Sequence, residues 1–84
     1  MTTDSKRLEP DVRRGIIIAA AVRDAQRNGG MFNITHGTVA AACPIETSKS
    51  TVLRYFPLLR DLYNAVCDAD DLLAKEARLQ GYER

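Results

Sequence analysis

A short segment of the chain, residues 47–55 (TSKSTVLRY), is dense in hydroxyl, ammonium, guanidinium and phenol groups, which can hydrogen-bond a polar partner. Hydroxyl and ammonium groups hydrogen-bond phosphates, and a guanidinium can pair with the two acceptors of guanine. The candidates for contact with DNA are Thr47, Ser48, Lys49, Ser50, Thr51, Arg54 and Tyr55. A solvated helix face would explain Lys49 and Arg54 alone, but a phenol beside a guanidinium is more typical of a binding surface.

Two further candidates, Thr35 and His36, precede a second short apolar segment. Thr35 suits a helix N-cap, a role worth about 1 kcal/mol with or without DNA. His36 is the only histidine and could reach a phosphate from the start of that helix. With Cys43 it could begin a metal site, but no further ligand has usable spacing. We therefore expect no metal and no cofactor.

Four basic residues near the N-terminus, Lys6, Arg7, Arg13 and Arg14, could contact the DNA backbone or simply be solvated. The net charge is only +1, but it is unevenly distributed. Residues 1–57 hold eight basic and five acidic side chains, whereas residues 58–84 hold four basic and six acidic ones. A basic front half is the asymmetry expected if one end of the molecule meets phosphate.

The apolar periodicity and the Pro and Gly signals predict an all-α fold, a small bundle of about four helices. Pro10 suits a first turn, Gly29 and Gly30 supply a stop, and Pro44 and Pro57 end short helices. Residues 1–9 are expected to form a flexible arm, and residues 10–84 a single helical domain. The expected helices span about 10–28, 36–43, 48–56 and 58–80.

Apolar residues in the last two helices suggest a core and a possible second contact surface. Val52, Leu53 and Phe56 are predicted to share a face that points into the core. The last helix carries Leu72, Leu73 and Leu79, more leucine than so small a core needs. These leucines either form a dimer seam or cap the other helices, and the sequence leaves both alternatives open.

Composition describes an ordinary globular protein of 84 residues, 45% hydrophobic and 27% charged, long enough for one domain. Two cysteines are too few for a disulfide framework and favour a reducing compartment. The apolar run at 15–22 is too short to span a membrane, and acidic residues near the N-terminus argue against a signal peptide. We expect a cytoplasmic protein without membrane contact.

Enzymatic chemistry has little support in the sequence. The chain has one histidine, no glycine-rich phosphate loop and no pair of carboxylates framed by apolar residues. We therefore predict no catalytic residues. A long helix followed by two short helices, the first rich in alanine and the second in hydroxyls, is instead the layout of a helix-turn-helix, here over about 35–56.

Residues 34–66 resemble the N-terminal DNA-binding region of the tetracycline-repressor (TetR) family of bacterial transcription factors. The pieces RYFP and DL are the most specific, and the turn is two residues longer than the usual spacing, at Glu46 and Thr47. The matching residues are Thr35, Val39, Ala40, Cys43, Ile45, Ser48, Thr51, Arg54, Tyr55, Phe56, Pro57, Asp61 and Leu62. Leu53 stands where that family usually has a tyrosine facing DNA.

The resemblance implies a recognition helix at 48–56 and double-stranded DNA as the partner. The chain stops before the family's ligand-binding domain, so no small-molecule effector is expected. We predict a small transcriptional regulator, a repressor from a bacterium, phage or mobile element, that acts as a homodimer or a DNA-induced pair. The alternative is a small helical adaptor or inhibitor, such as a phage packaging subunit, that uses the same face on a protein.

Overall fold

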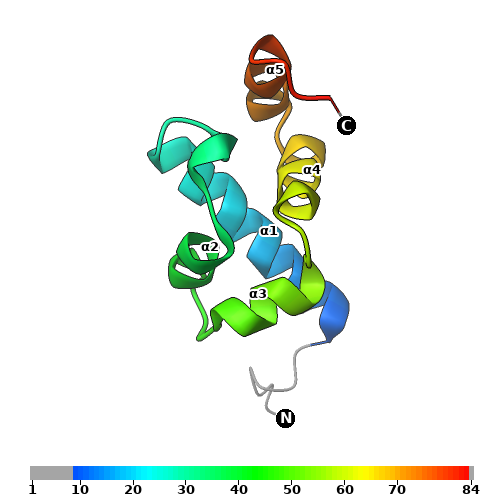
Figure 1. Cartoon of the computed structure of the whole chain (residues 1–84). Coiled ribbons are helices and arrows are strands. Elements are labelled where there is room, and N and C mark those ends of the chain that lie inside the picture. Colours follow the sequence, from blue (N-terminus) through cyan, green and yellow to red (C-terminus); the bar gives the residue numbers. More distant parts are fainter. Residues whose placement is uncertain (1–8, 84) are drawn as a thin grey trace.

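The computed structural model describes residues 9–83, and within them the chain forms only helices and connecting turns (Figure 1). The predicted all-α fold is confirmed. The expected arm at 1–9, with Lys6 and Arg7, lies outside the described residues except for Glu9, the N-cap of the first helix. The elements are α1 Pro10–Arg27, η2 Met31–Asn33, α2 His36–Ala42, α3 Lys49–Tyr55, α4 Leu59–Ala69 and α5 Asp71–Leu79.

Helix α1 is the central element, against which η2, α2 and α4 pack. Pro10 occupies its first turn, where the missing N–H costs nothing. Its buried face combines Ile17 with alanines at 20, 21 and 25, and these small side chains let neighbouring helices approach closely. The helix ends before Gly29 and Gly30, whose φ angles of 83° and 139° favour glycine.

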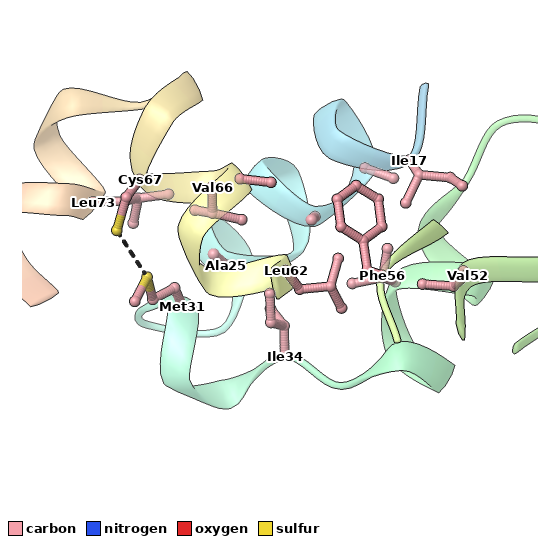
Figure 2. Packing of buried hydrophobic residues seen from close by; sticks show 14 of the residues in the cluster. Ile17, Ala25, Met31, Ile34, Val52, Phe56, Leu62, Val66, Cys67 and Leu73 are labelled. Atoms are coloured by element: carbon pink, nitrogen blue, oxygen red, sulfur yellow. Dashed lines mark hydrogen bonds between the residues drawn. The ribbon is translucent and has the colours of Figure 1, made fainter. Parts of the chain in front are cut away.

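The hydrophobic core is built by buried side chains of α1, α2, α3 and α4, and it continues toward η2 and α5 (Figure 2). At the η2 end, the Cys67 thiol donates a hydrogen bond to the sulfur of Met31 at 3.6 Å. Cys43 and Cys67 form no disulfide. The largest side chains that are almost fully buried are Phe56, Ile17, Met31, Ile34, Leu62, Val39, Val52 and Val66.

The prediction of a single C-terminal helix over 58–80 is wrong. The chain leaves the helical conformation at Asp70, between α4 and α5. This residue has φ −141° and ψ 107°, and its Oδ1 accepts a hydrogen bond from the Leu73 N–H at 2.9 Å. Its Oδ2 accepts a second bond from the Gln26 side chain of α1, at 3.1 Å. Aspartate is a preferred N-cap, so Asp70 ends α4 and begins α5. The described chain therefore has five α-helices rather than four.

The end of α5 is closed by a glycine turn that returns the chain to α4. Gly81 has φ 95°, and the N–H of Tyr82 bonds the carbonyl of Ala77 at 3.0 Å. The Tyr82 ring then packs edge-to-face against Phe32 and Tyr63, and its hydroxyl donates to Asn64 Oδ1 at 2.6 Å. These contacts fix α5 against α4 and η2.

Candidate nucleic-acid interface

Helices α2 and α3 pack against each other, and α3 lies at the end of the molecule opposite α5 (Figure 1). The turn between them runs over residues 43–48. Ser48 is the N-cap of α3, since its Oγ accepts a hydrogen bond from the Thr51 N–H at 3.2 Å. The hydroxyls of Ser48 and Thr51 also hydrogen-bond each other, at 3.1 Å. The Thr47 hydroxyl donates to the Ile45 carbonyl at 3.1 Å. Three of the predicted DNA-binding hydroxyls thus shape the start of α3.

The outer face of α3, defined by Lys49, Ser50, Leu53 and Arg54, is exposed to solvent. The inner side of the segment is buried, with Val52 and Phe56 almost fully enclosed. These two residues are four apart and lie one above the other along the helix. The structure therefore points Lys49, Ser50 and Arg54 outward, as the sequence-based hypothesis requires.

The prediction that Leu53 is a core residue is wrong. Leu53 is 36% exposed and lies on the outer face between Lys49 and Arg54. One residue of α-helix rotates the side chain by about 100°, so a residue next to Val52 leaves the buried line that Val52 and Phe56 define. Spacing alone could not place Leu53, because a residue three positions before Phe56 also shares a helix face with it; Phe56, however, is the C-cap of α3 and has left the helical conformation, with φ −135° and ψ 79°.

Tyr55 is half-buried and packs against the core cluster, whereas the sequence suggested an exposed phenol. Thr51 is also half-buried, and its N–H and hydroxyl both hydrogen-bond the Ser48 side chain at the N-cap of α3. Both residues lie at the edge of the outer face rather than at its centre. The ring of Tyr55 therefore contributes packing as well as a phenol group.

His36 links the start of α2 to the end of α3. Its Nε2 lies 2.7 Å from the carbonyl oxygen of Phe56, and the Nε2–H is the donor in the tautomer that forms this bond. The ring is partly buried. The structure thus gives His36 an internal partner, where the sequence suggested a phosphate.

Thr35 is the N-cap of α2, as predicted. Its Oγ1 accepts from the Thr38 N–H at 3.1 Å, while the Thr38 Oγ1 accepts from the Thr35 N–H at 2.9 Å. This reciprocal pair is a capping box in which threonine replaces the usual glutamate. The cap fixes the start of α2 and, through it, the position of His36.

Of the predicted backbone-contacting residues, Arg14 comes close to α3. Its guanidinium carbon lies 5.1 Å from the centroid of the Phe56 ring, a cation–π arrangement at the end of that helix. Arg14 is exposed, whereas Arg13 is half-buried. The structure therefore brings one basic residue of α1 against the Phe56 ring, at the end of α3.

Other kinds of site receive no support from the part of the chain that the structure describes. Over residues 9–83 there is no group of three His, Cys, Asp or Glu side chains placed to hold a metal ion. None of the helices in this range has both the length and the apolar character needed to cross a membrane. The two larger surface hollows lie along α1, beside α5 and α4, and α3 lines neither of them.

Comparison of the chain with protein-family models, with curated proteins and with solved structures finds no match. The described residues form a small all-α domain whose helix α3 exposes Lys49, Ser50, Leu53 and Arg54 at one end of the molecule.

Proposed function

We propose that this protein binds double-stranded DNA through a helix-turn-helix made of α2 and α3, with α3 as the recognition helix. It would act in the cytoplasm as a small transcriptional repressor related to the TetR family. The observation that carries the proposal is the outer face of α3, where an ammonium, a hydroxyl and a guanidinium are exposed on a helix whose opposite side is anchored in the core. A rigid helix with this composition fits the major groove.

Each exposed residue of α3 has a contact that its chemistry favours. Arg54 would hydrogen-bond O6 and N7 of guanine, and Ser50 a base edge or phosphate. Lys49, at the start of the helix, would pair with a phosphate. Leu53, exposed between them, would lie against a thymine methyl group, the apolar feature of the major groove. The protein would thus read guanine and thymine with neighbouring side chains.

The rest of the interface would position α3 on the sugar-phosphate backbone. Arg14 lies over Phe56 at the end of α3, and its exposed guanidinium could reach a phosphate beside the groove. The N-terminal Lys6 and Arg7 would add backbone contacts from outside the described residues. Contacts of this kind add affinity without sequence preference, because phosphates are the same at every base pair.

The first test is selection of bound fragments from random duplex DNA, followed by titration of the selected site with variants. Arg54→Ala should weaken binding to the selected site by about 5- to 150-fold, which corresponds to roughly 1–3 kcal/mol. Arg27→Gln is the matched control, because it removes one exposed positive charge at the far end of α1. Equal binding by Arg54→Ala and the parent would contradict the assignment of α3.

The second test is salt dependence, which separates DNA binding from a protein-adaptor role. If Lys49 contacts a phosphate, Lys49→Ala should lower the slope of log affinity against log salt by about 1. The parent should bind random duplex more weakly at physiological than at low salt, because bound counterions are released. A flat salt response, or no binding of any duplex, would favour an adaptor that uses the same face on a protein.

A further inference from the structure

A single hydrogen bond joins the first residue of α2 to the C-cap residue of α3. His36 begins α2, and Phe56 follows the end of α3. The Nε2–H of His36 donates to the Phe56 carbonyl at 2.7 Å, across 20 residues of chain. The turn at 43–48 joins the other ends of the same two helices. The bond therefore closes α2, the turn and α3 into a ring.

Helix α3 depends on α2 for its direction. Within residues 9–83, α2 is the one element that α3 packs against extensively. Val52 and Phe56 bury the inner side of α3, but the hydrophobic effect that favours this burial is not directional. A hydrogen bond, in contrast, constrains both a distance and an angle. The bond from His36 therefore specifies how α3 lies across α2, which burial alone does not.

Both partners of this hydrogen bond are held in place by further contacts. On α2, the capping box of Thr35 and Thr38 fixes the backbone on either side of His36. At the end of α3, the Phe56 N–H donates to the Val52 carbonyl at 2.8 Å, and the Phe56 ring is buried in the core. A bond between two groups that are already fixed loses little conformational entropy when it forms. The link between the two helices is therefore rigid.

We propose that His36 is a positioning residue for DNA recognition, which sets the angle of α3 through the Phe56 carbonyl and does not itself touch the nucleic acid. The inference rests on the proposed DNA binding, and it replaces the phosphate contact that the sequence suggested for His36. Arg54 lies two residues before Phe56, so the bond acts at the end of α3 that carries the side chain proposed to read guanine. Base-edge hydrogen bonds weaken steeply when their angle changes, so they require a defined helix orientation.

Loss of this hydrogen bond should reduce sequence discrimination more than non-specific affinity. Without it, α3 would spend part of its time in orientations that do not fit the site, and the apparent affinity falls by that fraction. One hydrogen bond shifts such an equilibrium by about 2- to 13-fold. Binding to random duplex depends mainly on charge, and His36→Ala removes none at about pH 8.5, where imidazole side chains are normally neutral. Affinity for random duplex should therefore stay nearly constant.

Replacement of His36 by two different amides tests the position of the donor. The amide nitrogen of glutamine stands as far along its side chain as Nε2 of histidine, whereas that of asparagine ends one bond short. His36→Gln should therefore bind the selected site as the parent does. His36→Asn and His36→Ala should each bind it about 2- to 13-fold more weakly, with little change on random duplex.

Lys49→Ala is the contrasting variant in these titrations. A lost phosphate contact weakens binding to the selected and the random duplex alike, and it lowers the salt slope. Equal losses on both duplexes for His36→Ala would mean that His36 contacts DNA, and would overturn the inference. Unchanged affinity of His36→Ala and His36→Asn for the selected site would overturn it as well.

NMR spectroscopy tests the positioning in the absence of DNA. Residual dipolar couplings of the backbone amides of α2 and α3 report the relative orientation of the two helices. The parent and His36→Gln should share one orientation, whereas His36→Ala and His36→Asn should show altered or averaged couplings in α3. Circular dichroism would verify that the variants remain helical, and His36→Asn serves alone if His36→Ala unfolds.

The couplings also separate this inference from the proposed function. If the parent binds no duplex, the proposed DNA binding has failed, and the couplings alone decide whether His36 fixes α3 against α2. If both donor-deficient variants keep the couplings of the parent, the positioning role of His36 is refuted, whatever the affinity of the protein for DNA.

Discussion

Phe56 and Leu53 lie three residues apart at the end of α3, but the structure gives them opposite environments. Phe56 is 2% exposed, so Phe56→Ala should destabilise the protein by about 3–5 kcal/mol through lost burial and an internal cavity. Loss of the contact with Arg14 adds about 0.5 kcal/mol, because that guanidinium is exposed. A domain of 84 residues has a total stability of roughly 4–13 kcal/mol. The substitution should therefore remove a large part of it.

Leu53→Ala is the matched control for Phe56→Ala. The Leu53 side chain borders solvent, so truncation leaves no enclosed cavity, and alanine has the higher helix propensity. We expect a cost of about 1 kcal/mol or less.

Urea unfolding followed by circular dichroism gives both free energies by linear extrapolation. If Phe56→Ala is too unstable to fold, Phe56→Leu provides a smaller step in the same direction. Similar losses for Leu53→Ala and Phe56→Ala would refute the assignment of Leu53 to the exposed surface and of Phe56 to the core.

Substitutions at four further positions test local features of the fold by the same unfolding measurement. His36→Ala should lower the free energy of unfolding by about 1 kcal/mol, because the Phe56 carbonyl loses its hydrogen-bond donor. His36→Gln should lower it less, because an amide can donate in place of the imidazole. Equal losses for the two variants would mean that this hydrogen bond contributes little to stability. Asp70→Ala should cost about 1 kcal/mol and speed amide exchange in α5, whereas Asp70→Asn keeps the cap and should be nearly neutral. Gly81→Ala should destabilise the protein by about 1–2 kcal/mol, because the φ angle of 95° is unfavourable for alanine. Gly15→Ala, at a position in α1 with open space around it, should stabilise the protein by about 0.5–1 kcal/mol. A stabilising Gly81→Ala would contradict the turn at the end of α5.

The first three helices could be located from the sequence because their ends are fixed by local chemistry. Pro10 begins α1, and Gly29 and Gly30 follow its end. Pro44 lies just past the end of α2, and Ser48 caps α3. Each of these signals acts within one turn of the chain, so no tertiary information was needed to place the boundaries within a residue.

The break at Asp70 could not be located in the same way, because aspartate fits both a helix and an N-cap. The leucines on either side continue at helical spacing, which favours one long helix. The contact between Asp70 and Gln26 of α1, 44 residues away in the chain, has no local sequence signal. Position in the fold therefore decides the role of this residue.

The exposure of the charged residues of α3 was predictable from the sequence, whereas the environments of Leu53 and His36 were not. The sequence identified Lys49 and Arg54 as exposed polar groups of α3, and the structure agrees. The sequence pattern assigned Leu53 to the core together with Val52 and Phe56, because a helix of only two turns is too short for periodicity to separate these three apolar residues. The bond from His36 to Phe56, across 20 residues, was also unpredictable, since nothing near either residue indicates the other.

The bond between His36 and the Phe56 carbonyl has a consequence for how this domain could change during evolution. It holds α3 at its end, while Val52 and Phe56 hold it along its length. The turn at 43–48 therefore only has to connect two helices whose relative position is set elsewhere. Doubling the length of such a loop costs only about 0.6 kcal/mol of closure entropy. Insertions in this turn should be tolerated, so homologous chains could differ in length here and still present α3 in the same direction.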